Sequence, residues 1–350
     1  MRAFSIIAAL LAANVGEAVP SSTPALKWAL AIHGGAGTID RASITGQSEQ
    51  AYREALGKGL DAAARILAAG GTALDAVESA IRLMEDDPLF NAGRGAVFTA
   101  AGRNELDAAI MDGASLNAGA VTGVTRVRHP ITLARAIMES SPHVMLAGEG
   151  AESFARLRGL EIVDPSFFFT QRRWQELERT LMERGEPIPP RPAGAPQPEA
   201  LLWPEAAAPQ TFGTVGVVAL DSHGNLAAGT STGGTTGKLS GRVGDSPIIG
   251  AGTYASNQSC AVSGTGTGEF FIRLTVAREV CALMQYKNYG AQRAADEVIQ
   301  KRLMLLRGSG GIIVISPKGE VAWSFNTPGM YRAMASSGGM RRISIFRDEP

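Results

Sequence analysis

A valine-rich strand that begins directly after a proline-rich segment limits the folds open to this chain. The run from Phe212 to Leu220 is short, apolar and rich in β-branched residues, which is typical of a buried strand. The segment before it, residues 185–210, is rich in proline and alanine and predicts a flexible linker rather than a helix or a strand. Thr214 therefore stands where a loose segment enters the interior of the protein.

The position of Thr214 suggests a nucleophile. A threonine hydroxyl reacts poorly unless a base lies beside it, and one solution is the residue's own α-amine, which is freed when the chain is cut just before it. Such an amine has a pKa of about 8 and accepts a proton near neutral pH. Gly213 suits the cut, because it lets the hydroxyl approach the preceding carbonyl. We interpret Thr214 as a nucleophile that becomes a new N-terminus; an isolated Gly-Thr pair is more often simply the start of a strand.

Long motifs in a fixed order carry a family resemblance. The second half of the chain contains Gly213–Gly216, Thr230–Gly234, Gly241–Pro247, Gly250–Ala255 and Thr265–Glu269. The first half adds Ala31–Gly37, Pro88–Gly93 and Glu105–Gly113. Together they resemble the plant-type L-asparaginase and isoaspartyl aminopeptidase family of N-terminal-nucleophile (Ntn) hydrolases. The resemblance extends over roughly Lys27 to Arg347, apart from the linker.

The resemblance implies an α/β fold, a four-layer αββα sandwich of the Ntn-hydrolase type. The sequence pattern alone reaches only a mixed α and β class, in which strand runs are followed by helix pairs. We expect strands at residues 28–32, 96–99, 106–111, 117–127, 214–221, 225–231, 247–251, 259–263, 312–316, 321–325 and 342–346. We expect helices at residues 48–69, 73–84, 131–138, 148–157, 170–184, 269–286 and 291–306.

The resemblance also implies the residues that perform the reaction. Thr214 resembles the autocatalytic nucleophile, and Thr232 resembles the second threonine that hydrogen-bonds it. Asn91 resembles the asparagine that orients the freed amine. Thr265 and the backbone N–H of Gly266 resemble the oxyanion hole, where each donor is worth about 2.7–4 kcal/mol. Without the family context, Asn91 could equally be a turn former. The glycine-threonine turn that contains Thr265 and Gly266 could equally serve to pack a helix closely against a sheet.

A second group of residues resembles a receptor for an amino-acid head group. Arg242 resembles the clamp on the substrate α-carboxylate, since a planar guanidinium binds a carboxylate bidentately. Asp245 resembles the partner of the substrate α-ammonium, together with the carbonyl of Gly268; Gly266 also belongs to this substrate site. The alternative is that Arg242 and Asp245 form a solvated ion pair in a loop.

The implied reaction requires no cofactor. The family also has a structural sodium ion held by backbone carbonyls, which here would come from Met84, Glu85, Asp87, Phe90, Ala92 and Arg94. Backbone ligands leave little trace in the side chains, so this assignment rests on position alone.

The implied function is hydrolysis of L-asparagine to aspartate and ammonia, and of β-aspartyl (isoaspartyl) dipeptides. The precursor would cut itself between Gly213 and Thr214. Residues 27–184 and 214–350 would then be the α and β parts of one domain, joined before cleavage by the linker 185–213. The resemblance further implies a dimer of such αβ units, that is, a heterotetramer.

Composition bears on partners and compartment. The chain has 33 Lys+Arg and 33 Asp+Glu and a pI of about 6.9, so neither nucleic acid nor an anionic membrane is an expected partner. The 4 histidines form no paired metal motif. We expect the 2 cysteines, Cys260 and Cys281, to be buried free thiols rather than a disulfide.

The N-terminal segment resembles a secretory signal. Arg2 precedes the apolar run Phe4–Val15, and small residues lead to Ala18. The run is too short to span a bilayer, so residues 1–18 predict a signal peptide cut after Ala18 and export to the periplasm or outside the cell. The mature form is not expected to bind a membrane. The alternative is a packed or disordered extension on a cytoplasmic enzyme.

Other hydrolase and nucleotide-binding motifs fit poorly. Gly229–Gly233 matches the Gly-x-Ser-x-Gly pattern of a serine esterase, but that triad needs its histidine after the serine, and the last histidine, His223, precedes Ser231. Lys238 is followed by Leu239, where a phosphate-binding loop needs serine or threonine.

Two alternatives to the isoaspartyl peptidase interpretation stay open. Glycosylasparaginases, in the same superfamily, have Asp before the nucleophile and Thr-Gly-Asn-Gly-Asp later. This chain has Gly213 and, at Thr265–Glu269, Thr-Gly-Thr-Gly-Glu, which favours the isoaspartyl peptidase branch. A non-catalytic binding protein that keeps the fold is the alternative of another class. Against it, every matched catalytic position is present.

Overall fold

Two β-sheets form the centre of the protein. The computed structural model describes residues 27–37, 39, 41–196 and 213–349. Across the larger sheet the strand order is β12 (Arg341–Phe346), β11 (Gly329–Ser336), β1 (Ala29–Gly37), β5 (Val215–Leu220), β6 (Leu226–Thr232), β2 (Leu106–Asp112), β3 (Ala118–Val124) and β4 (Met145–Ala147). Across the smaller sheet it is β10 (Val321–Phe325), β9 (Gly310–Ile315), β8 (Cys260–Gly266) and β7 (Thr253–Ser256).

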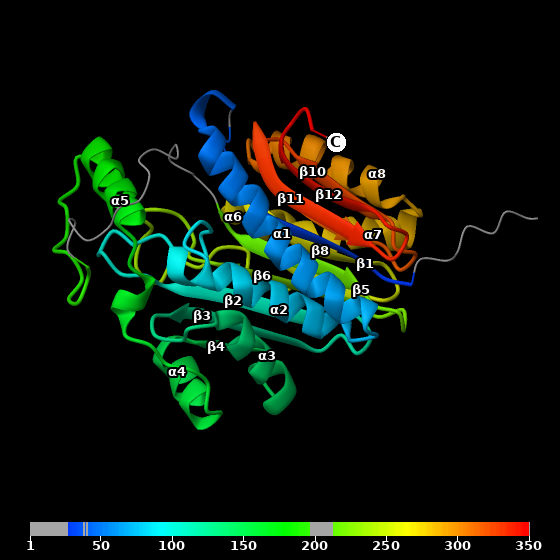
Figure 1. The fold of residues 1–350 in the computed structure, drawn as a ribbon, viewed down its shortest axis with the longest axis horizontal. Coiled ribbons are helices and arrows are strands. Elements are labelled where there is room, and N and C mark those ends of the chain that lie inside the picture. The colour runs from blue at the N-terminus through cyan, green and yellow to red at the C-terminus, as the bar shows by residue number, and fades with distance from the viewer. Residues whose placement is uncertain (1–26, 38, 40, 197–212, 350) are drawn as a thin grey trace, which may run out of the picture.

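Helices cover the outer face of each sheet (Figure 1). The helices are α1 (Gly46–Ala68), α2 (Ala73–Asp86), α3 (Pro130–Ser140), α4 (Gly148–Leu157), α5 (Gln171–Arg184), α6 (Gly268–Leu274), α7 (Val276–Lys287) and α8 (Ala291–Asp296). α1, α2 and α3 pack on the larger sheet, α7 and α8 pack on the smaller one, and the two sheets pack on each other. This arrangement is a four-layer αββα sandwich, which confirms the expected fold.

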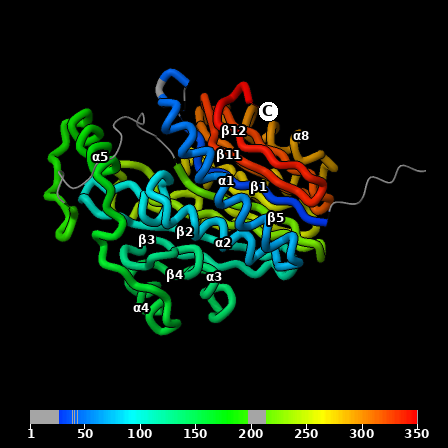
Figure 2. Tube along the Cα trace, viewed as in Figure 1, coloured from blue at the N-terminus to red at the C-terminus, as the bar shows by residue number. Residues whose placement is uncertain are grey.

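Both halves of the sequence contribute to the larger sheet. Figure 2 shows β1, from the N-terminal part, lying between β11 and β5 from the C-terminal part. β1 pairs antiparallel with both of these strands. The residues on either side of the predicted cleavage site therefore belong to one domain.

Local sequence signals explain the first two helices. Thr45 caps α1 by accepting from the backbone N–H of Ser48 at 3.1 Å, and Thr72 caps α2 in the same way by accepting from Asp75 at 3.1 Å. Gly70 adopts a positive φ of 83° between them, where the chain reverses. The two helices lie side by side over the larger sheet (Figure 1).

Alternating side chains divide the interior into layers. One face of β1 and β5 joins the core beneath α1 and α2, through Leu30, Ile32, Val215 and Val217. The other face joins the core between the sheets, through Ala29, Ala31, Val218 and Leu220. Because successive side chains of a strand point to opposite faces, His33 and Thr214 fall on the inter-sheet side.

The predicted strand at residues 96–99 is wrong. Its first residue, Ala96, has an extended backbone, but the segment forms only an isolated bridge, at Thr99. Asparagine side chains take the place of a neighbouring strand, since Asn91 Oδ1 accepts from Val97 N at 2.9 Å and Asn104 Nδ2 donates to a backbone carbonyl at 2.9 Å. An apolar extended segment held in this way resembles a strand in sequence.

The predicted strand at residues 247–251 is also wrong. The segment turns instead, with Ile248 N donating to Asp245 O at 3.0 Å and Ala251 N donating to Ile248 O at 2.9 Å. The strand of this region, β7, begins later, at Thr253. Proline and glycine at the ends of the segment are turn formers, and they outweigh its two isoleucines.

Further differences concern helix continuity and two strands that were not predicted. The expected helix at residues 269–286 is two helices, because Thr275 adopts a left-handed φ of 46° between α6 and α7. α8 passes into a π-helical segment at Glu297–Leu303 within the expected helix 291–306. β11 and the short edge strand β4 were not expected.

The expectation of free thiols is wrong as well. Cys260 and Cys281 are fully buried, as expected, but they form a disulfide with a Cα–Cα distance of 5.3 Å. The bond joins β8 to α7, which pack together in the core of the smaller sheet. The cysteines lie 21 positions apart in the sequence, and this spacing gives no sign that they meet.

Two of the sequence expectations fall largely outside the described residues. The segment expected to be a signal peptide, 1–18, lies outside them, as do residues 197–212 of the expected linker. Residues 185–196, which are described, form no helix or strand. In the described part of the chain, no helix has the length and apolar character needed to cross a bilayer.

Candidate active site

The two predicted catalytic threonines meet between the sheets. Thr214 precedes β5 and Thr232 ends β6, and both side chains are buried. The Thr214 hydroxyl donates to Thr232 Oγ1 at 3.0 Å. Thr232 Oγ1 also accepts from the backbone N–H of Gly234 at 3.0 Å, which fixes its position. The structure thus brings together the pair that the sequence motifs indicated.

The backbone around the Gly213–Thr214 bond is tightly held. The Gly213 carbonyl accepts from the backbone N–H of Asn91 at 3.1 Å. Gly35 in β1 lies against Gly213, because a Cβ at Gly35 would approach Gly213 Cα to 2.6 Å. Gly35 also has a φ of 112°, which favours glycine. The Gly213 carbonyl therefore has a hydrogen-bond donor directed at its oxygen and no side chain on its own residue, which suits attack by the Thr214 hydroxyl.

Asn91 lies at the site, but its side chain is engaged with the backbone. Asn91 Nδ2 donates to Gly234 O at 2.7 Å, and Asn91 Oδ1 accepts from Val97 N at 2.9 Å. The carbonyl of Asn91 accepts from Gly233 N at 3.1 Å. In the intact chain, Asn91 therefore connects Val97, in the segment that follows it, to the turn after Thr232, and its N–H donates to the Gly213 carbonyl.

The predicted head-group residues converge on Gly268. A Cβ at Gly268 would lie 2.9 Å from Arg242 Nη2 and 3.0 Å from Asp245 Oδ1. Asp245 is buried, and its Oδ2 has no hydrogen-bond partner among the described residues. Burial raises the pKa of Asp245 to about 7, while Arg242 acts in the opposite direction. A cation that enters the site would therefore stabilise the charged form of the Asp245 carboxylate.

Arg242 has a protein partner that the sequence did not indicate. Arg242 Nη2 lies 2.9 Å from Glu269 Oε1, and Arg242 Nε donates to the same oxygen at 3.0 Å. Glu269 lies in the first turn of α6 with an exposed side chain. The guanidinium is held by one carboxylate oxygen, while its Nη1 group is directed toward Gly244.

The predicted oxyanion residues end β8. Thr265 is fully buried, and its hydroxyl has no hydrogen-bond partner among the described residues. Ala261 on the same strand packs between the sheets, and alternation places Ser263 and Thr265 on that same face. Gly266 has a φ of 156°, and a Cβ there would lie 2.4 Å from Ser309 O. A buried hydroxyl with no partner is available to a ligand.

A buried charged pair beside Thr232 was not predicted. Asp107 of β2 is the cross-strand partner of Thr232, and its Oδ2 lies 4.0 Å from Lys238 Nζ. Burial raises the pKa of Asp107 and lowers that of Lys238. Asp107 lies within the Glu105–Gly113 motif, so the motif contained a signal for it, but nothing in the sequence assigned it a partner.

The predicted sodium residues fit a cation held by carbonyls. Met84 and Glu85 lie in the last turn of α2, where carbonyls lack helical partners. A Cβ at Gly93 would lie 2.3 Å from Glu85 O, so the chain folds back onto this helix end. The Glu85 carboxylate is used elsewhere, accepting from Ser231 Oγ at 2.7 Å. The available donors are neutral oxygens, which suit a hard cation.

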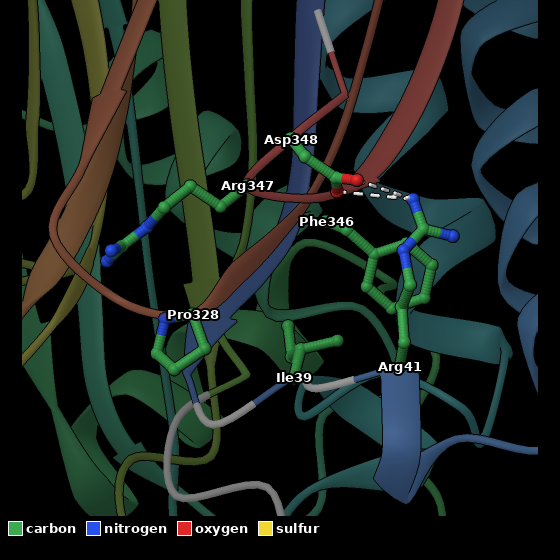
Figure 3. A pocket seen from close by; sticks show the side chains of 6 residues that line it. All are labelled: Ile39, Arg41, Pro328, Phe346, Arg347 and Asp348. Atoms are coloured by element: carbon green, nitrogen blue, oxygen red, sulfur yellow. Dashed lines mark hydrogen bonds and ion pairs between the residues drawn. The ribbon is translucent and has the colours of Figure 1, made fainter.

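An open surface hollow lies apart from these residues. Figure 3 shows its lining, which is Ile39, Arg41, Pro328, Phe346, Arg347 and Asp348. Its cations are already paired, because Arg41 Nη2 donates to Asp348 at 3.1 Å and Arg347 donates to Thr327 O at 2.7 Å. None of the predicted site residues lines it. The buried polar groups between the sheets are the better candidate for chemistry.

Known proteins resemble this chain over nearly its whole length. A family profile described as asparaginase matches residues 26–345. The chain is 50% identical over 323 residues to an isoaspartyl peptidase of Escherichia coli strain K12, covering 92% of this chain and 97% of that protein. It is 44% identical over 328 residues to a probable isoaspartyl peptidase/L-asparaginase 2 of Arabidopsis thaliana, covering 91% and 99%.

An archaeal protein is also similar to this chain. The chain is 41% identical over 311 residues to a plant-type L-asparaginase of Thermococcus kodakarensis, covering 89% of this chain and 97% of that protein. The profile, the relatives and the αββα sandwich agree with the motifs. The chain therefore belongs to the asparaginase family of N-terminal-nucleophile hydrolases, in the branch of isoaspartyl peptidases and plant-type L-asparaginases.

Proposed function

We propose that the protein cleaves itself at Gly213–Thr214 and then hydrolyses L-asparagine and β-aspartyl dipeptides. One observation carries this proposal. The Thr214 hydroxyl is bonded to Thr232 at 3.0 Å, directly beside a carbonyl that accepts from Asn91 N at 3.1 Å. The names of the relatives, isoaspartyl peptidase and plant-type L-asparaginase, support the same activity.

Self-cleavage would begin with the Thr214 hydroxyl. Its oxygen attacks the Gly213 carbonyl carbon, the C–N bond breaks, and an ester forms between Gly213 and the threonine oxygen while the α-amine takes up the proton. Water then hydrolyses the ester, leaving a Gly213 carboxylate and a free Thr214 amine and hydroxyl. The Asn91 N–H supports the first step, since a fixed donor stabilises the charge that develops on the carbonyl oxygen.

In the matured protein, the Thr214 amine would serve as the base. It accepts the hydroxyl proton, and the oxygen attacks the side-chain carbonyl of the substrate. Thr265 Oγ1 and the N–H of Gly266 stabilise the oxyanion, a role supported by the absence of another partner for that buried hydroxyl among the described residues. Ammonia or the peptide's amine leaves, and water releases aspartate from the ester on Thr214.

Substrate selection would depend on the free head group. Arg242 binds the α-carboxylate, and the buried Asp245 binds the α-ammonium. The unpartnered Asp245 Oδ2 supports this assignment, because an ammonium would supply the missing partner. An α-linked aspartyl peptide lacks a free α-carboxylate on its aspartate, so it should be a poor substrate.

The proposal also includes export, a structural sodium ion and a dimer of αβ units. Export is favoured by the Cys260–Cys281 disulfide, since such bonds persist in oxidising compartments. A structural sodium ion would be held by the carbonyls at the end of α2 and the turn after it, and would support the loop that carries Asn91. A dimer of αβ units is proposed from the family resemblance alone.

The proposed specificity can be tested with two isomeric dipeptides. β-Aspartyl-leucine and α-aspartyl-leucine have the same composition and differ only in which carboxyl forms the peptide bond. The matured protein should release leucine from the β isomer and leave the α isomer intact. Cleavage of both at comparable rates would contradict the head-group assignment, and cleavage of neither, with L-asparagine also untouched, would contradict the proposed reaction.

A further inference from the structure

His33 is a buried group for which the proposed reaction has no use. Its side chain is fully buried on the inter-sheet face of β1. Its Nδ1 lies 3.1 Å from the Thr214 carbonyl oxygen, and its Nε2 lies 2.9 Å from Ser263 Oγ. The histidine therefore connects the backbone of the proposed nucleophile to β8 of the smaller sheet.

The contact continues through a row of buried hydroxyls. Ser263 Oγ lies 2.7 Å from Thr230 Oγ1, and Thr253 Oγ1 donates to Thr230 Oγ1 at 2.6 Å. Thr230 lies on β6 of the larger sheet, whereas Ser263 and Thr253 lie on β8 and β7 of the smaller sheet. The row crosses the inter-sheet space, where Ala31, Val218, Ile313 and other apolar residues pack.

The Thr214 carbonyl at one end of the row determines the direction of the hydrogen bonds from His33 to Thr230. A backbone carbonyl only accepts, so His33 Nδ1 must carry the proton. Burial lowers the pKa of His33 to about 3, so the ring is neutral and Nε2 is an acceptor. Ser263 then donates to His33, which leaves Thr230 to donate to Ser263 and Thr253 to donate to Thr230. Thr230 also lies 3.4 Å from the Gly252 carbonyl, which is a longer contact than its 2.7 Å contact with Ser263. Thr253 ends the row, and its single proton faces two acceptors, Thr230 Oγ1 at 2.6 Å and the Ser246 carbonyl at 3.0 Å.

Gly216 makes room for this contact. A Cβ at Gly216 would lie 1.9 Å from Ser263 Oγ and 2.3 Å from His33 Nε2. Gly216 is the cross-strand partner of His33 in the larger sheet. The second glycine of the Gly213–Gly216 motif is thus explained by the hydrogen bond that passes over it.

We propose that His33 is a positioning residue for Thr214, held in its Nδ1–H tautomer by Ser263 and Thr230. The inference rests on the proposed function of Thr214. Once the bond before Thr214 is cut, its amine end is no longer held by the preceding residue. The hydrogen bond from His33 to the Thr214 carbonyl then limits rotation about this residue and keeps its hydroxyl and amine aligned for attack, and misalignment of reacting groups is costly in rate.

Ser263→Ala tests the proposal, with Ser259→Ala as the matched control. Ser259 is also a buried serine of the β7–β8 hairpin region, but its hydroxyl has no partner among the described residues. We expect Ser263→Ala to cleave itself, to keep its KM for β-aspartyl-leucine within about twofold, and to lose roughly 10- to 100-fold in kcat. Ser259→Ala should match the wild type, and Ser263→Thr should recover part of the lost rate.

Nitrogen-15 NMR of histidine-labelled protein gives a readout that a general loss of packing would not. In the wild type, the His33 signals should show a neutral ring protonated at Nδ1, unchanged between about pH 5 and pH 9, and Ser263→Ala should alter them. This measurement decides the proposal even if the variant fails to fold, because an Nε2–H tautomer or a charged ring in the wild type overturns it. Equal kcat losses in Ser263→Ala and Ser259→Ala, or an unchanged kcat in Ser263→Ala, would also overturn it.

The proposed function and the role of His33 fail in different ways. A wild-type chain that stays uncut and inactive contradicts the proposed function. A wild-type chain that cuts itself and hydrolyses the dipeptide, while Ser263→Ala does so with the same kcat, contradicts only the role of His33.

Discussion

Asp245 Oδ2 and Thr265 Oγ1 are buried polar atoms of the proposed site that have no hydrogen-bond partner among the described residues. Leaving a buried polar group unpaired costs about 1–3 kcal/mol, so a ligand that supplies partners for both atoms would gain binding free energy. The proposed substrate supplies both partners: its α-ammonium for Asp245 and its developing oxyanion for Thr265. At the scale of single residues, the site is incomplete without a ligand of this chemistry.

Asp245→Asn should change the pH dependence of the reaction as well as its rate. Burial raises the pKa of Asp245 to about 7, so below that pH the carboxyl takes up a proton and loses its attraction for the α-ammonium. The Thr214 amine, with a pKa of about 8, is also protonated as the pH falls, and it then no longer acts as a base. In the wild type, log(kcat/KM) for L-asparagine should therefore fall at low pH with a slope approaching two.

In Asp245→Asn that slope should approach one, because only the amine titrates. The loss of the charged partner should lower kcat/KM by about 2 kcal/mol, roughly 30-fold, at pH 8. The kcat/KM profile from pH 5 to pH 9 checks both effects. A variant that keeps the steep acid limb of the wild type would show that Asp245 is not one of the titrating groups.

Thr265→Val should separate activity from stability. The substitution removes the hydroxyl proposed for the oxyanion hole, so kcat should fall by roughly 100- to 1,000-fold. The hydroxyl has no partner among the described residues, so thermal unfolding should be unchanged or shifted slightly upward. Steady-state kinetics and a melting curve on the same preparation check this. A large drop in the melting temperature would indicate that the hydroxyl has a structural partner instead.

At the scale of elements, β8 carries most of the connections between the smaller sheet and the site. It contributes Ser263 and Thr265 on its inter-sheet face and Cys260 on the face toward α7. α6 follows directly and carries Glu269 against Arg242. A change that loosens β8 should therefore reach both the proposed oxyanion hole and the head-group residues.

The disulfide should stabilise this element. It joins Cys260 and Cys281, which are 21 positions apart, and a loop of about this size corresponds to about 3 kcal/mol in the chain-entropy model. The double variant Cys260→Ala/Cys281→Ala should melt at a lower temperature than the oxidised wild type. Wild-type protein unfolded and refolded under reducing conditions should melt near the variant. Equal melting temperatures for all three would contradict a stabilising role for the bond.

Gly35→Ala should slow self-cleavage. The added Cβ would meet Gly213 Cα at 2.6 Å, and the φ of 112° at this position disfavours alanine. The displaced Gly213 carbonyl would then lose its alignment with Asn91 N and the Thr214 hydroxyl. Gly150→Ala in α4 is the matched control, because a Cβ there has nothing within 4 Å. The fraction of uncut chain over time on a denaturing gel checks the prediction, and equal rates for the two variants would contradict it.

At the scale of the whole molecule, the sequence predicts the fold where pattern and motif agree. The strand from residue 214 was recognisable from its valine content, and the helix before Gly70 from apolar residues at helical spacing and the glycines that end it. The segment 96–99 was not, because asparagine side chains replace a partner strand there. The pairing of Cys260 with Cys281, of Arg242 with Glu269 and of Asp107 with Lys238 depends on how β2, β8, α6 and α7 pack, which local sequence does not contain.

For the site, too, motifs predict which residues take part but not the contacts that depend on how the elements pack. Motifs indicated the identity of Thr214, Thr232, Thr265, Arg242 and Asp245. They did not indicate that the Asn91 side chain would be engaged by backbone while its N–H meets the Gly213 carbonyl, because that contact joins segments more than a hundred residues apart.

The proposed reaction depends most on Thr214 as a self-released nucleophile, and an intact-mass spectrum tests that role directly. Freshly purified wild-type protein should give two chains, the second beginning at Thr214 and ending at Pro350. Thr214→Ala should give one uncut chain without hydrolytic activity. A single intact wild-type chain after prolonged incubation, or full activity in Thr214→Ala, would contradict the account.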